Sequence, residues 1–203
     1  MGYRLAADHT FPAQINDAKH AIRYLKALGA REGLIDGDRM VLFGTSAGGH
    51  IAALVAATPG LFEPAGLTAE ETTFDSSVAG LVSVVGPTDL VSLDAPGTDD
   101  WIRDLARAML GCDPCSDAQL AEASPTSYLS PDLPPAYWAY GRTDDHLVHW
   151  YTQGVVIASA WAEQVGPGSS RLDLIDGQGH NIFHWSINQR ALEEFVDVAV
   201  GRR

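Results

Sequence analysis

A serine flanked by glycines carries the most specific chemistry in this chain. Residues 44–49 read Gly-Thr-Ser-Ala-Gly-Gly, which places Ser46 at the centre of a G-x-S-x-G pentapeptide. An apolar run (39–43) precedes it and a helical pattern (48–57) follows, so the pentapeptide falls on a predicted strand-to-helix turn. Such a turn raises the serine hydroxyl over a sheet and points the first helical N–H, that of Ala47, at an oxyanion. The turn would also suit phosphate binding or simple close packing, but no lysine follows the glycines as in a phosphate-binding loop.

A serine hydroxyl becomes a nucleophile only when a base removes its proton, and that base needs an orienting carboxylate. Asp144 and Asp145 follow the apolar run 136–141, and His180 follows the run 171–175. The order serine, aspartate, histidine, with each residue just after a predicted strand, predicts the triad of an acyl-transfer enzyme. Both aspartates fit as the acid. We favour Asp144, because the end of the strand fixes its position more closely, and keep Asp145 as the alternative.

Six further histidines compete with His180 for the role of base. None of them follows a later predicted strand as His180 does, so we expect surface or supporting positions for them. They are His9, His20, His50, His146, His149 and His184.

The elements that would position the triad alternate along the chain. Apolar runs predict strands at 39–43, 77–85, 136–140 and 171–175, and helical spacing predicts helices from Phe11 to a stop at Gly29 and at 48–57, 101–110, 150–163 and 187–198. This alternation predicts an α/β fold with an open, mainly parallel sheet. The run 39–43 is apolar on both faces, as in a fully buried strand. Residues 90–135 break the alternation, and we expect a cap inserted into a single domain spanning 1–203.

Composition excludes several classes of protein. The chain has 203 residues, of which 46% are hydrophobic and 19% charged, as expected for one globular domain. Its formal net charge of −13 would repel phosphate backbones, so we expect no nucleic-acid partner. We find neither a membrane-spanning apolar run nor a signal peptide, and expect a cytoplasmic protein without a membrane span.

Two cysteines and a group of aromatic residues carry weaker signals. Cys112 and Cys115 lie in the expected cap with no second pair for zinc, so we expect no metal site and free or incidentally paired thiols, with a regulatory disulfide as the alternative. The aromatic residues around the acid loop would either line a pocket for an apolar acyl or aryl group or belong to the core. They are Tyr137, Trp138, Tyr140, Trp150, Tyr151 and Trp161.

Several motifs together resemble those of bacterial esterases of the α/β-hydrolase superfamily, in the feruloyl/acetyl-xylan esterase-like and hormone-sensitive-lipase-like groups. The motifs are Tyr3-Arg4-Leu5-Ala6, Phe11-Pro12-Ala13, residues 44–50, Gly86-Pro87-Thr88-Asp89, Ala123-Ser124-Pro125 and Gly179-His180-Asn181. The resemblance implies hydrolysis of a small-molecule ester through an acyl-enzyme on Ser46. His180 would act as base and then acid, with Asp144 or Asp145 orienting it and without a metal or organic cofactor.

The sequence departs from that family at its start. Family members carry a His-Gly-Gly segment upstream of the Tyr-Arg-Leu stretch, and its N–H groups complete the oxyanion hole, whereas this sequence begins at Met1-Gly2-Tyr3. The comparison implies a sheet without its first strands, whose exposed edge a homodimer or a second chain would cover. Loss of one oxyanion donor would lower the rate about 10²–10³-fold.

Three functions are therefore compatible with the sequence. The first is a serine carboxylesterase acting on small or aryl esters, such as acetyl or feruloyl esters. The second is an amidase or formamidase with the same triad, because the acyl-transfer machinery is shared. The third is a catalytically weak remnant or a binding subunit.

Overall fold

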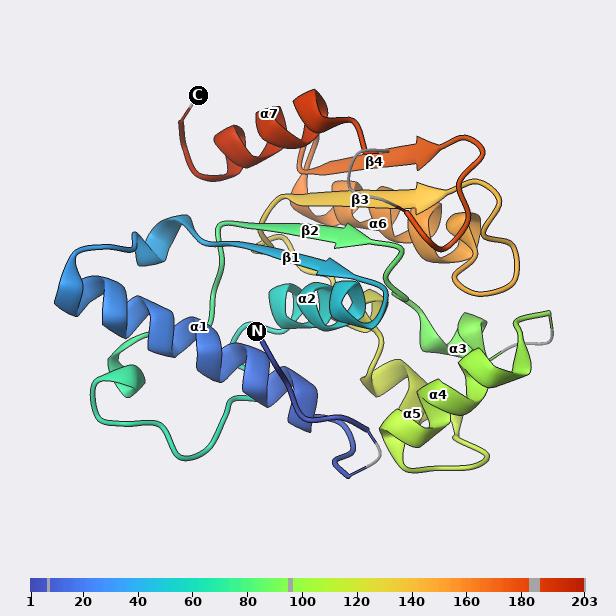
Figure 1. Ribbon diagram of the computed structural model, residues 1–203, viewed down its shortest axis with the longest axis horizontal. Helices are drawn as coiled ribbons and strands as arrows, with labels where there is room; N and C mark the ends of the chain where they lie inside the picture. Colours follow the sequence, from blue (N-terminus) through green and yellow to red (C-terminus); the bar gives the residue numbers. More distant parts are fainter. Residues whose placement is uncertain (7, 95–96, 183–186, 203) are drawn as a thin grey trace.

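Four parallel strands form one sheet in the order β1-β2-β3-β4 (Figure 1). The computed structural model describes residues 1–6, 8–94, 97–182 and 187–202. The strands are β1 (Val41–Thr45), β2 (Gly80–Val84), β3 (Ala136–Gly141) and β4 (Ser170–Ile175). Each strand pairs in parallel with the next one in the sequence, so the predicted parallel sheet is confirmed. The loops that follow the strands meet at its carboxyl edge.

Helices cover both faces of the sheet. The four long helices outside the cap are α1 (Ala13–Glu32), α2 (Ala47–Ala57), α6 (Val156–Val165) and α7 (Gln189–Ala199). Neighbouring residues of β3 point to opposite faces. Tyr137 meets Phe195 of α7 with ring centroids 5.6 Å apart, and Trp138 meets Trp161 of α6 at 5.4 Å. Helix α2 lies on the α6 side, and α1 packs against α2.

Three short helices and one longer one form the segment between β2 and β3. They are α3 (Leu90–Leu93), α4 (Asp100–Leu110), α5 (Asp117–Glu122) and the 3₁₀ helix η3 (Pro125–Tyr128). Figure 1 shows α3, α4 and α5 grouped beyond the carboxyl edge of the sheet. Helices α3 and α5 were not predicted, because they are too short to show a helical period in the sequence. Residues 90–135 are called the cap below, and their role as a lid stays a prediction.

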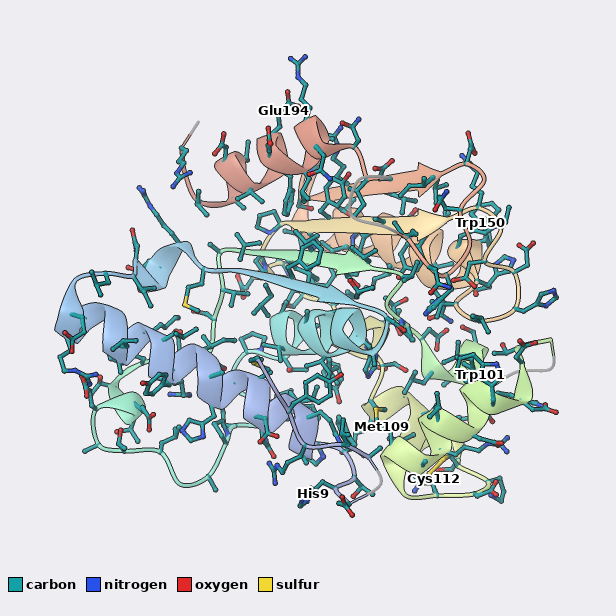
Figure 2. The ribbon with its side chains drawn as sticks, in the orientation of Figure 1. His9, Trp101, Met109, Cys112, Trp150 and Glu194 are labelled. Atoms are coloured by element: carbon teal, nitrogen blue, oxygen red, sulfur yellow. A yellow bond between two sulfur atoms is a disulfide. The ribbon has the colours of Figure 1, made fainter. Side chains whose placement is uncertain are left out.

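Cys112 and Cys115 form a disulfide directly after α4, so the two thiols are paired and not free. Cys112 is labelled in Figure 2 near the end of that helix. A regulatory role for this disulfide stays a prediction.

None of the helices described here is long and apolar enough to cross a membrane. The cytoplasmic location stays a prediction.

Strand β1 corrects one expectation. It was predicted to be buried on both faces, but Phe43 is 56% exposed. An apolar run indicates complete burial only where other elements cover both faces of the strand. Leu42 packs with residues of α1 and α2, whereas the neighbouring Phe43 points to the opposite face of this edge strand and stays exposed. The homodimer or second chain expected over this edge stays a prediction.

Helix α1 corrects a second expectation, because it does not stop at Gly29. It continues to Glu32, and Gly33 ends it with φ +68° and an N–H bond to the Gly29 carbonyl. Gly29 instead allows a close approach, since a Cβ there would lie 2.3 Å from the Ile35 carbonyl oxygen.

The predicted helix 150–163 is also divided. It begins as a π-helix, η4 (Trp150–Val155), and continues as α6. A Cβ on Gly154 would lie 2.7 Å from the Tyr140 ring, so this turn packs directly on β3. Apolar spacing does not distinguish a π turn from an α turn.

A buried lysine of helix α1 binds the connection between α2 and β2, residues 58–79. The Lys19 side chain is wholly buried, and its Nζ donates to the carbonyl oxygens of Thr58 and Leu61 and lies 3.3 Å from Glu63. Burial lowers the pKa of Lys19. Arg23 and Ser76 also bind Glu63, so one carboxylate joins α1 to the end of this connection.

We predict that Lys19→Ala lowers the free energy of unfolding by about 2–4 kcal/mol, because buried carbonyls and Glu63 lose their partner. Arg31→Ala is the matched control on the same helix, since Arg31 is half exposed and pairs with Glu32 and Glu70 at the surface. It should leave stability nearly unchanged. Urea unfolding measures both, and equal effects would contradict a structural role for the buried amine.

Candidate active site

Ser46 joins β1 to α2 in a backbone conformation that is rare for a residue with a side chain. Its φ is +52° and its ψ is −120°, and its N–H donates to the Val84 carbonyl at 2.8 Å. Such a conformation costs about 1–3 kcal/mol and persists only where its surroundings fix it. Gly44 makes the turn possible, because a Cβ there would lie 2.1 Å from the Gly48 carbonyl oxygen.

Ser46, His180 and Asp144 form a continuous hydrogen-bonded chain. The Ser46 Oγ lies 2.9 Å from His180 Nε2, and His180 Nδ1 lies 2.8 Å from Asp144 Oδ2. A carboxylate only accepts, so Nδ1 carries the proton and Nε2 is free to accept from the serine hydroxyl. The arrangement has the geometry of a nucleophile, a base and an orienting acid.

The structure brings Asp144, and not Asp145, to His180. The Asp144 side chain is 1% exposed, and its Oδ1 accepts from the N–H groups of Leu147 and Val148 at 3.3 and 3.1 Å. Both of its oxygens are therefore fixed. Asp145 is 57% exposed, and its carboxylate lies 3.9 Å from His149 Nε2.

The loop carrying His180 crosses directly over the end of β3. A Cβ on Gly141 would lie 2.2 Å from the Gln178 carbonyl oxygen, so this crossing requires a glycine. The N–H of Thr143 also donates to that carbonyl at 3.0 Å. The acid loop and the base loop are thus joined through backbone as well as through their side chains.

Among the described histidines, only His180 hydrogen-bonds to Ser46. His50, in the first turn of α2, is buried and its Nδ1 lies 2.9 Å from the Pro87 carbonyl, while burial lowers its pKa. The Nε2 atom of His20, on α1, lies 3.4 Å from the Glu71 carboxylate. His184 lies outside the described residues.

The loop after β2 is fixed by two buried side chains. The Tyr140 hydroxyl donates to the Gly86 carbonyl at 2.5 Å, and burial raises the pKa of Tyr140. Gln153 Oε1 accepts from the N–H groups of Thr88 and Asp89 at 2.7 and 2.8 Å, and its Nε2 donates to the Asp89 carbonyl at 2.9 Å. This loop therefore has a defined position beside the serine turn.

A cavity of about 390 Å³ opens beside Ser46. Its wall combines the serine turn, the amino-terminal segment and the cap, and the lining residues are mostly apolar. They are Tyr3, Leu5, Ala6, Gln14, Ser46, Ala47, His50, Ile51, Pro87, Leu90, Leu93, Ile102, Leu105, Ala106, Met109 and Val148.

The cavity is not lined by the aromatic residues that surround the acid loop in the sequence. Tyr137, Trp138, Tyr140 and Trp161 are wholly buried in the core, and neither Trp150 nor Tyr151 contributes to the lining. The cap residues that do line it were not identified from the sequence. The sequence does contain a pattern that marks them, since Ile102, Ala106 and Met109 have the spacing of one apolar helix face.

No metal centre is formed by the part of the chain that the structure describes. No group of three or more histidine, cysteine, aspartate or glutamate side chains converges there.

Comparisons with known proteins support the same fold. The model of the BD-FAE family matches residues 1–160. The probable carboxylic ester hydrolase LipM of Mycobacterium tuberculosis is 31% identical over 159 residues, which are 77% of this chain, and the chain spans only 36% of the length of that relative.

Two solved structures extend the comparison. A truncated form of a carbohydrate esterase from gut microbiota aligns over 99% of this chain and 73% of its own, with a TM-score of 0.79 and 21% identity. Thermogutta terrifontis esterase 2 phosphonylated by sarin aligns over 98% of this chain and 68% of its own, with a TM-score of 0.69 and 25% identity. The α/β-hydrolase fold implied by the sequence motifs is confirmed.

We predict that Gly44→Ala lowers the free energy of unfolding by about 2–4 kcal/mol, because its Cβ would collide with backbone atoms of α2. Gly48→Ala is the matched control in the same turn, since a Cβ there meets nothing within 4 Å. That variant should be neutral or more stable by up to about 1 kcal/mol, because alanine favours a helix. Thermal and urea unfolding measure both, and a tolerated Gly44→Ala would contradict the close packing of this turn.

Proposed function

The chain belongs to the BD-FAE family, and from this premise we propose that it hydrolyses carboxylic esters through an acyl-enzyme on Ser46. The observation that carries the proposal is the hydrogen-bonded chain from Ser46 through His180 to Asp144. Two relatives support it. LipM is described as a probable carboxylic ester hydrolase, and Thermogutta terrifontis esterase 2 is phosphonylated by sarin.

In the first step, the Ser46 hydroxyl attacks the ester carbonyl while His180 Nε2 takes its proton. The negative charge forms on the carbonyl oxygen, and Ala47 donates its N–H, which has no intrahelical partner at the start of α2. Asp144 stabilises the imidazolium that results. The imidazolium then gives its proton to the departing alcohol oxygen, leaving the acyl group on Ser46.

The second step reverses these roles with water. His180 Nε2 takes a proton from a water molecule, whose oxygen attacks the acyl carbon. The tetrahedral intermediate collapses, and the imidazolium returns the proton to Ser46 Oγ. The products are a carboxylic acid and a free enzyme.

Acetyl and feruloyl esters are the substrate classes that the sequence motifs imply, and they are the first to test. An amidase would use the same atoms, because the leaving group alone differs. An aryl ester and the matching anilide separate the two functions, since an anilide rate comparable with the ester rate would remove the esterase assignment.

We predict that a fluorophosphonate probe labels Ser46 stoichiometrically, because an activated serine attacks phosphorus regardless of the natural substrate. His180→Ala should abolish labelling, and Asp144→Asn should lower the rate about 10³–10⁴-fold through loss of the correct imidazole tautomer. Intact-mass analysis with mapping of the modified residue measures labelling.

Asp145→Asn is the matched control, because the same substitution on the neighbouring exposed carboxylate should change the rate less than about 3-fold. A folded protein that is not labelled, or an ester hydrolysis unchanged in Ser46→Ala, would favour the non-catalytic remnant. Equal losses in the two asparagine variants would contradict the assignment of Asp144.

A further inference from the structure

The cavity beside Ser46 borders only one side of the nucleophile. Ser46 and Ala47 line it, whereas His180 does not. A tetrahedral carbon on Ser46 carries three further groups: the oxyanion, the leaving oxygen and the acyl substituent. The leaving oxygen must face His180 Nε2 to receive its proton, and the oxyanion must face the Ala47 N–H. The acyl substituent is therefore the group directed into the cavity.

We propose that this cavity is an acyl-binding site selective for an uncharged, apolar acyl group of about six to eight carbon atoms. The inference rests on the proposed acyl-enzyme and specifies its substrate class. It differs from an acetyl esterase, because an acetyl group would leave most of the cavity unfilled.

The size of the cavity sets the lower end of this range. An apolar protein cavity of roughly 150 Å³ accommodates benzene, which has six carbons. The present cavity of about 390 Å³ is larger, and part of it adjoins the reacting carbonyl at Ser46. An acyl chain or aryl group of middle length would fill the remainder.

The polarity of the wall sets the chemical class. No lysine, arginine, aspartate or glutamate is among the described residues that line the cavity, so a charged acyl group would lose its hydration without a partner. The polar members of the wall are mostly engaged elsewhere: Gln14 Nε2 donates to the His9 carbonyl, and His50 Nδ1 lies against the Pro87 carbonyl. Their remaining atoms, Gln14 Oε1 and His50 Nε2, are buried and have no hydrogen-bond partner among the described residues. Both atoms are buried, so an entering group meets a mostly apolar surface.

Helix α4 supplies the wall opposite the serine turn. Ile102 and Ala106 are 9% and 8% exposed, and both pack with α3 and α5 in the core of the cap. Met109 lies at the end of α4, where its carbonyl accepts from the Phe11 N–H at 2.7 Å (Figure 2). Side chains of α4 therefore form part of the wall that limits the length of the acyl group.

The first experiment is a series of p-nitrophenyl esters, from acetate through butyrate, hexanoate and octanoate to dodecanoate, at concentrations below micelle formation. Each methylene that becomes buried should raise kcat/KM about 3-fold, so hexanoate, with four more methylenes, should exceed acetate about 80-fold. The value should fall at dodecanoate, and a charged succinyl ester should be the poorest substrate. A preference for acetate, or equal values across the series, would overturn the proposal.

A second series distinguishes the acyl group from the alcohol. Hexanoate esters of methanol, butanol and hexanol should differ less than about 3-fold, because the leaving group faces His180 outside the cavity. A stronger dependence on the alcohol than on the acyl chain would overturn the proposal.

Two substitutions on α4 test the wall directly. Ala106→Leu should reduce octanoate hydrolysis at least about 10-fold while retaining butyrate hydrolysis, and Met109→Ala should move the optimum to longer chains. Ala108→Leu is the matched control, because Ala108 is exposed on the same helix and does not line the cavity. Thermal unfolding confirms that each variant is folded. If Ala106→Leu does not fold, an unchanged optimum in Met109→Ala would itself overturn the proposal.

The two proposals fail differently. A protein that hydrolyses no ester and is not labelled at Ser46 removes both. A protein that is labelled at Ser46 but has no preference for middle-length acyl groups removes the acyl site alone.

Discussion

The hydrogen bond between Ser46 Oγ and His180 Nε2 is the contact on which the arrangement of the site depends. It joins residues 134 positions apart in the sequence at 2.9 Å. Parallel pairing makes this contact available, because the loops after β1, β3 and β4 leave the sheet at the same edge. The hydrogen bond between Ser46 and His180 is short because the backbone segments that carry the two residues approach closely. Gly44 and Gly141 both lie where a Cβ would meet a carbonyl oxygen at little more than 2 Å, so the loops can approach only at glycines.

The sheet also positions the cap through a small number of buried polar groups. Gln153 binds the loop after β2 from η4, and the Asp89 carboxylate accepts from Val91 and Ser92 at the start of α3. The same loop presents the Pro87 carbonyl to His50 in α2. The loop after β2 thus contacts α2, the helix that follows Ser46. The same loop leads into the cap, which forms part of the cavity wall.

Sequence reasoning identified the elements best where local pattern and chain order agree. The strand, serine and helix of residues 41–57 have a clear local signature, and the order of Ser46, Asp144 and His180 matches three strand ends. The end of the predicted strand favoured Asp144 but left Asp145 open, because only the folded loop shows which of the two side chains turns inward to accept from Leu147 and Val148. The burial of β1 was overestimated, because an apolar run does not show whether both faces of the strand are covered. The lining of the cavity was not predicted, because α4 and Ser46 reach the same cavity only through tertiary packing.

The position of Val148 shows that the reaction centre and the cavity are not independent. Its N–H donates to Asp144 Oδ1 at 3.1 Å, and the same residue lines the cavity. The cap also contacts this loop, since the Asp99 N–H donates to the His146 carbonyl at 3.0 Å. A group that enters the cavity therefore packs against the residue that holds the orienting carboxylate. Because Asp144 is buried and fixed by only a few hydrogen bonds, its position beside His180 depends on the packing of that wall.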